Sequence, residues 1–146
     1  MRRLAAGAYA DIARAQCALI RAQLAVWLWP TGRLVAASTG AAAEPDPPGA
    51  ALLARRMGRA VHRAATYGLF RPKCLTRALA LKKLLEDRGV RSARLCVGVR
   101  PDGSRLLAHA WVEHGEAVLA DRPAHVHSFS RLAELDLMAS PGDRGE

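Results

Sequence analysis

Three residues of this chain have the types and the setting that thiol chemistry requires. Cys74 opens a strongly helical stretch at residues 74–81. His109 lies in an apolar, strand-like run at 107–113, and Asp121 closes the next apolar run. A thiol at the start of a helix, an imidazole on one strand and a carboxylate on the next can become neighbours in space. The pattern therefore makes a prediction about function as well as about fold.

The predicted roles follow from elementary acid–base chemistry. A cysteine is nucleophilic only as its thiolate, and the positive end of a helix dipole favours that form. An imidazole can hold the thiolate as an ion pair and later protonate a departing amine. A carboxylate keeps the imidazole in the useful tautomer. We therefore predict Cys74 as nucleophile, His109 as base and acid, and Asp121 as the orienting group. The predicted reaction is acyl transfer through a thioester, with water or an amine as acceptor.

Taken singly, each of these residues has a common structural explanation. A cysteine at a helix start is often a small core residue, a strand histidine is often buried and hydrogen-bonded, and an aspartate at a strand end often forms a turn. Their order, and the elements that carry them, favour the catalytic interpretation. Neither Tyr67 nor Thr76, which lie near Cys74 in sequence, can be assigned as a donor to the oxyanion.

The remaining metal-ligand and cofactor signals are weak. Cys17 and Cys96 are expected to be structural. Cys96 and the histidines outside the triad lack the usual spacing of zinc ligands; these histidines are His114, His125 and His127. His125 and His127 are expected to be loop residues. The chain has no glycine-rich phosphate loop. We therefore expect no metal and no cofactor.

The hydrophobic periodicity predicts helices first and an antiparallel meander afterwards, which is an α+β domain. Residues 1–49 are expected to form an N-terminal helix and a Pro/Ala-rich loop that pack on or dock to the core at 50–146. The predicted elements are helices at 4–28, 50–66 and 73–88, strands at 91–100, 105–113 and 117–121 with a turn at 101–104, an irregular stretch after Asp121, and a short helix near 129–138.

Composition and charge limit the classes of binding partner that we expect. The chain has 146 residues and a net charge of +9, and residues 51–100 hold 13 of the 22 basic residues but only 2 acidic ones. Such a segment could meet an acidic peptide, a phosphate backbone or an anionic membrane. Aromatic residues make up only 5%, so stacking on nucleic-acid bases is a weak option. Three cysteines with no C-x-x-C pair, no secretory signal and no apolar run long enough to span a bilayer indicate the cytoplasm.

Two motifs carry a specific resemblance. The helix motif C-L-x-x-A-L-x-L begins at Cys74, and the strand motif A-H-A-W-V-E contains His109. Together with Gly89-Val90 and Val97-Gly98-Val99, they resemble the transglutaminase-like cysteine peptidases of lasso-peptide biosynthesis. The resemblance is strongest over residues 50–122. It implies a transglutaminase/papain-like core in which Cys74, His109 and Asp121 form the triad.

The resemblance also implies a function and partners. A member of that family removes the leader from a ribosomally made precursor peptide (a RiPP), and a lasso cyclase of the asparagine-synthetase-like type then forms the macrolactam. The leader is gripped by a winged-helix-like recognition domain. Only about fifty residues precede the core here, so we expect that domain to be a separate protein. Two alternatives stay open: a transglutaminase-like acyl transferase with an amine acceptor, and a non-catalytic basic module that binds an acidic peptide or nucleic acid.

Overall fold

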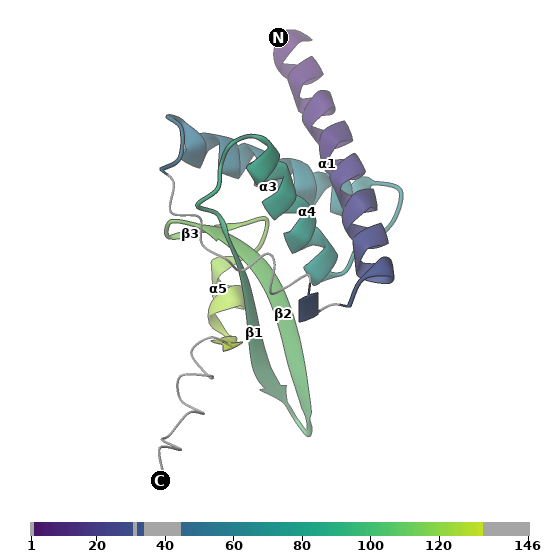
Figure 1. The fold of residues 1–146 in the computed structure, drawn as a ribbon, viewed down its shortest axis with the longest axis vertical. Coiled ribbons are helices and arrows are strands. Elements are labelled where there is room, and N and C mark those ends of the chain that lie inside the picture. Colours follow the sequence, from purple (N-terminus) through teal and green to yellow (C-terminus); the bar gives the residue numbers. More distant parts are fainter. Residues whose placement is uncertain (1, 31, 34–44, 133–146) are drawn as a thin grey trace.

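The computed structural model describes residues 2–30, 32–33 and 45–132. Helices come first and a small antiparallel sheet follows, so the α+β prediction is confirmed. Figure 1 shows the three long helices gathered at one end of a long hairpin whose tip extends away from them. The three long helices are α1 (Arg2–Leu28), α3 (Ala50–Tyr67) and α4 (Cys74–Asp87). Their bounds differ from the predicted ones by at most two residues.

Small residues allow these three helices to pack closely around one core. α1 and α3 contact each other, and both contact α4. Half of the buried side chains in this core are alanines, and larger apolar side chains fill the space between the helices. The fully buried large residues on the helices include Leu19, Met57, Val61, Leu81 and Leu85. Burying one such side chain contributes about 1.5–3 kcal/mol. Within the described ranges, no helix is both long and apolar enough to cross a membrane.

Within the described residues, four strands form one antiparallel sheet in the order β3-β2-β1-β4. Two glycines with positive φ, Gly103 (61°) and Gly115 (59°), close its tight turns. The first turn is shorter than predicted, because Pro101 and Asp102 continue the strand and pair across the hairpin. The strands are β1 (Arg94–Asp102), β2 (Arg105–His114), β3 (Ala117–Leu119) and β4 (Ser130–Arg131).

The sheet has two different apolar faces. Ala110 and Val112 of β2 belong to the helical core, whereas Trp111 belongs to a second cluster with Val126 and Phe129. Gly98 of β1 lies beneath that second cluster. A Cβ at this position would come within 2.9 Å of side-chain atoms of both Phe129 and Trp111. Only glycine therefore allows the aromatic layer to approach the strand so closely.

The segment after Asp121 differs from the prediction. It is not irregular: Pro123–His127 forms the short helix α5, and the chain then returns to β1 as β4. A helix was predicted near 129–138, but Ser130–Arg131 is a strand, and residues 133–138 lie outside the described residues. The local sequence pattern is a weak signal here, because β4 is two residues long and its pairing partner is more than thirty residues away.

Candidate active site

The thiol of Cys74 lies at the first residue of α4. Lys73 before it is extended, with φ −71° and ψ 164°, so the helix begins at the cysteine itself. The first N–H groups of a helix have no partner inside it, and the helix dipole is positive at this end. Cys74 is free and partly buried. Its sulfur therefore belongs to the residue at the positive end of the α4 dipole.

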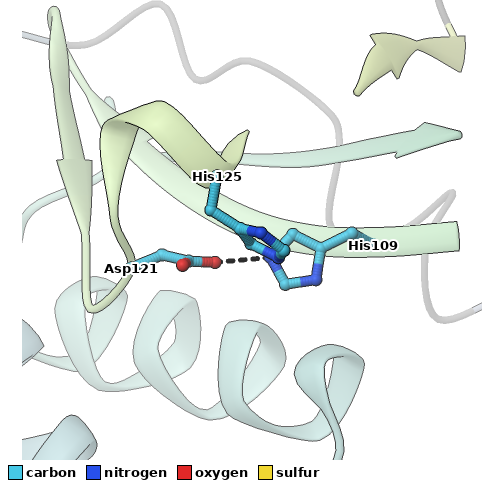
Figure 2. A group of neighbouring side chains, drawn as sticks. All are labelled: His109, Asp121 and His125. Atoms are coloured by element: carbon cyan, nitrogen blue, oxygen red, sulfur yellow. Dashed lines mark hydrogen bonds and ion pairs between the residues drawn. The ribbon is translucent and has the colours of Figure 1, made fainter. Parts of the chain in front are cut away.

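The imidazole of His109 comes from β2 and is held on several sides. Its Nε2 is hydrogen-bonded to Oδ2 of Asp121 (Figure 2). Its ring stacks near Phe129 at a centroid distance of 5.1 Å, and His125 of α5 meets it edge-on at 4.9 Å. Because Asp121 engages Nε2, Nδ1 is the nitrogen left for another proton partner.

Asp121 reaches His109 through a sharp change in the backbone after β3. β3 ends at Leu119, and Ala120 adopts a φ of 57°, a left-handed conformation that non-glycine residues rarely take. Such a residue costs of the order of 1 kcal/mol and persists only where its surroundings hold it. Arg77 of α4 donates to the Ala120 carbonyl at 3.2 Å. The backbone N–H of Arg122 donates to Oδ1 of Asp121 at 2.7 Å, which fixes the second carboxylate oxygen.

Cys74, His109 and Asp121 line one cavity between α4, β2 and the turn after β3. Its volume is about 20 Å³, which is enough for one water molecule. Within the part of the chain that the structure describes, no hydrogen bond joins the Cys74 sulfur to His109. The two groups share the wall of one cavity.

Comparison with known proteins identifies the family of this chain. A family model described as the transglutaminase-like superfamily matches residues 18–134. The chain belongs to the transglutaminase-like superfamily. It is also 37% identical over 67 residues to the microcin J25-processing protein McjB of Escherichia coli. That alignment covers 46% of this chain and 31% of the relative, so the chain matches less than a third of the relative's length. No solved structure matches it.

These matches confirm the transglutaminase-like resemblance that the two motifs indicated. The similarity to a processing protein also agrees with the narrower resemblance to the lasso-peptide peptidases. The three predicted residues all fall inside the matched family region, residues 18–134. Their catalytic roles stay a prediction, because the comparisons assign no role to single residues.

Neither side chain that was considered for the oxyanion lines the cavity of this transglutaminase-like site. Tyr67 is 86% exposed at the end of α3. Thr76 is buried, and its hydroxyl donates to Gln23 of α1 at 3.4 Å. Thr76 therefore joins two helices, and the unpaired N–H groups at the start of α4 are the better candidates for oxyanion donors.

Two site residues escaped the sequence analysis. Arg77 lies one helical turn after Cys74, a spacing that puts both on the same face of α4, and it reaches Ala120. His125 was expected in a loop, but it lies on α5 against His109 (Figure 2). Ligand atoms of His109, Asp121 and His125 lie within 4.8 Å of one another, so these three could hold a cation. His127 is not part of this group.

The end of the strand motif has a structural role. Glu113 accepts hydrogen bonds from Trp111 at 2.9 Å and from Arg131 at 2.6 Å, and Arg94 lies 3.5 Å away. Burial raises the pKa of Glu113, but the Trp111 N–H and the two guanidinium groups outweigh it and lower the pKa overall. Nearby, burial and the charge of Glu113 raise the pKa of Cys96.

The other two cysteines therefore differ from Cys74. A raised pKa keeps Cys96 in its thiol form, which agrees with the predicted structural role. Cys17 is exposed on α1, so it is not a core residue.

Proposed function

We propose that this chain is a cysteine peptidase that removes the leader from the precursor of a lasso peptide. One observation carries the proposal: Cys74, at the start of a helix, shares a cavity with an imidazole that is hydrogen-bonded to a carboxylate. This is the set of groups that acyl transfer through a thioester needs. The similarity to the microcin J25-processing protein supports a peptide as the substrate.

In the proposed first step, the Cys74 thiolate attacks the carbonyl carbon of the last leader residue. A C–S bond forms, and N–H groups at the start of α4 stabilise the oxyanion. The C–N bond then breaks, and the amine of the core peptide leaves with a proton from Nδ1 of His109. Asp121 keeps a proton on Nε2 throughout and stabilises the imidazolium.

In the second step, water attacks the thioester and gives a proton to Nδ1 of His109. The C–S bond breaks, the leader departs as a carboxylic acid that then loses its proton to solvent, and the thiolate returns. The small volume of the cavity, about 20 Å³, suits one attacking water molecule better than a bulky amine acceptor. Hydrolysis is therefore favoured over transfer to a second peptide.

The proposal includes the partners that the resemblance implies. The substrate is the precursor peptide, a separate winged-helix-like protein presents its leader, and an asparagine-synthetase-like lasso cyclase uses the freed amine. The proposed location is the cytoplasm, where precursors of this kind are made. None of these steps requires a metal or an organic cofactor.

The test is to incubate the purified chain with a candidate precursor and its recognition protein and to follow the products by mass spectrometry. We expect separate leader and core masses. Cys74→Ala should reduce the rate by about 10⁴-fold or more, whereas Cys17→Ala, which alters an exposed cysteine on α1, should cleave normally. Leader release that persists in Cys74→Ala would overturn the thiol mechanism. Covalent gain of an added amine without hydrolysis would establish the transferase instead.

A further inference from the structure

A broad groove adjoins the small cavity of the candidate active site. It has a volume of about 1000 Å³ and runs between α3, β3 and the turn that carries Asp121. Arg77, Ala120 and Asp121 line both spaces, so the groove opens onto the candidate site. The cavity itself has room for about one water molecule. A peptide that is cut at Cys74 must therefore lie mostly in a neighbouring space of this kind.

Unpaired positive charge lines one wall of the groove. Arg55, Arg59 and Arg63 follow one another at four-residue steps on α3, and Arg122 also lines the groove. All four are exposed, and none forms an ion pair within the described part of the chain. Like charges at this spacing destabilise a helix.

On α4, by contrast, lysines pair with acidic residues of the same helix. Its lysines Lys82 and Lys83 each face an acidic residue one turn later, at 3.2 Å and 3.3 Å, whereas α3 contains no acidic residue at all. The arginines on α3 therefore have no acidic partner on their own helix, unlike the lysines of α4, and they can pair with a ligand.

The groove fits an extended peptide better than a nucleic acid. Its other wall includes β3, an edge strand whose outer side pairs with no strand in the described chain, and such an edge can accept an extended peptide. Arg55, Arg59 and Arg63 lie about 6 Å apart along the helix axis. This matches the spacing of about 7 Å between alternate residues of an extended strand. No tryptophan, tyrosine or phenylalanine lines the groove to stack on bases.

We propose that this basic groove binds an acidic segment of the substrate peptide, with acidic residues at alternate positions, beside the bond that Cys74 attacks. The proposal rests on the proposed peptidase function for its substrate, but binding can be measured without turnover. An exposed arginine paired with a carboxylate is screened by salt. Binding should therefore weaken as ionic strength rises.

The first experiment measures binding of a fluorescein-labelled peptide, Glu-Ala-Glu-Ala-Glu-Ala, by anisotropy. We expect saturable binding that falls about tenfold or more in the double variant Arg59→Glu/Arg63→Glu, and a gain in binding of the matching lysine peptide. The control variant Lys83→Glu/Arg105→Glu makes the same change in net charge at exposed positions outside the groove; it should bind almost as the wild type does. Equal losses in both double variants would overturn the proposal.

The milder variant Arg59→Gln/Arg63→Gln guards against misfolding, since it removes charge without reversing it. Circular dichroism should report native helix content for it, with a loss of about threefold or more in peptide affinity. Unchanged affinity in this folded variant would contradict the groove as the binding site. If a single-stranded oligonucleotide of equal charge binds more tightly than the peptide, and the same variant loses that binding, the ligand of the groove is a nucleic acid.

A second experiment tests whether the groove leads to the candidate site. Iodoacetamide alkylation of Cys74 is followed by peptide mapping, with the exposed Cys17 as an internal reference. Saturating acidic peptide should slow alkylation of Cys74 about fivefold and leave Cys17 unchanged. Equal rates with and without peptide would place the acidic segment elsewhere. If the peptide binds and protects Cys74 but no precursor is cleaved, the peptidase proposal fails while the groove stands.

Discussion

Asp121 and Glu113 each contact an aromatic side chain of β2, but the groups that balance their charges differ. Asp121 meets His109, and Glu113 meets Trp111, only two residues further along the strand. Glu113 is 7% exposed and is bound by an indole N–H and two arginines. Asp121 is 21% exposed, and within the described residues its one ion-pair partner is His109, which carries a charge only when it is protonated.

The difference separates a structural carboxylate from one that is available for chemistry. The charge of Glu113 is already balanced by guanidinium groups, so it anchors β4 and the aromatic layer to the sheet. The charge of Asp121 is balanced only when His109 becomes protonated. A carboxylate that stabilises a transient imidazolium must have a charge that no other cation already balances. The comparison therefore predicts loss of activity at one carboxylate and loss of stability at the other.

Among the variants that test this comparison, Asp121→Asn gives the largest expected effect. The amide keeps a similar shape but removes the charge and disturbs the tautomer of His109, so the rate of cleavage should fall roughly 10³-fold. The melting temperature should stay within a few degrees of the wild-type value. Single-turnover kinetics and thermal unfolding on the same sample check this. A normal rate would remove Asp121 from the mechanism.

Glu113→Gln should show the reverse pattern. It leaves Arg131 and Arg94 beside a neutral amide in a buried position, and the free energy of unfolding should fall by about 3 kcal/mol. The rate constant of the folded fraction should change little. Urea unfolding combined with saturation kinetics measures both quantities. A large loss of rate at unchanged stability would mean that the two carboxylates do not differ as proposed.

Arg77→Met tests whether the hydrogen bond from Arg77 to Ala120 holds Asp121 in position. It keeps an apolar stem of similar length but removes the donor to the Ala120 carbonyl, so Asp121 is held less firmly. We expect kcat at saturating peptide to fall about tenfold. Lys83→Met, on an exposed position of α4, provides the control and should leave kcat unchanged. If Arg77→Met turns over at the wild-type rate, the left-handed Ala120 is held by packing alone.

A third carboxylate, Asp46, gives the smallest effect. Burial raises its pKa, but hydrogen bonds from Ser92, His114 and the backbone N–H of Arg91 and Ser92 outweigh it and lower the pKa to about 2. A lowered pKa in the folded state stabilises the protein above the unfolded value of 3.8 and loses that contribution as the pH falls toward 2.

Asp46→Asn should therefore reduce the dependence of stability on pH between about 4 and 2. Urea unfolding at several pH values in this window checks the slope. An identical slope in the variant and the wild type would assign the acid sensitivity to other groups, with Glu113 the first to examine because its pKa is also lowered.

Much of the fold was predictable because its signals are local. The helices α1, α3 and α4 each carry a long apolar stripe, and the alternating strands β1 and β2 are joined by a short glycine turn. The segment after Asp121 was not predictable in the same way. α5 and β4 are short, and their stability comes from packing on Trp111 and pairing with β1 rather than from their own pattern.

The candidate site also contains residues with local sequence signals and residues without them. Residue type and order pointed to Cys74, His109 and Asp121, since a thiol at a helix start and an imidazole on a strand are recognisable locally. Arg77 and His125 were missed because their relevance depends on partners that fold beside them. The bond from Arg77 to Ala120 spans 43 residues, and nothing in the sequence near Arg77 marks it.

The types and order of the residues predicted which chemical groups are present, the helix start that carries the thiol, and the family to which the chain belongs. The fold was needed to show that Asp121 bonds Nε2 of His109, that Glu113 is neutralised by arginines, and that arginines of α3 border a groove adjoining the cavity that Cys74 lines. Periodicity and helix-start signals act over a few residues. Hydrogen bonds, charge compensation and cavities depend instead on groups that only folding brings together.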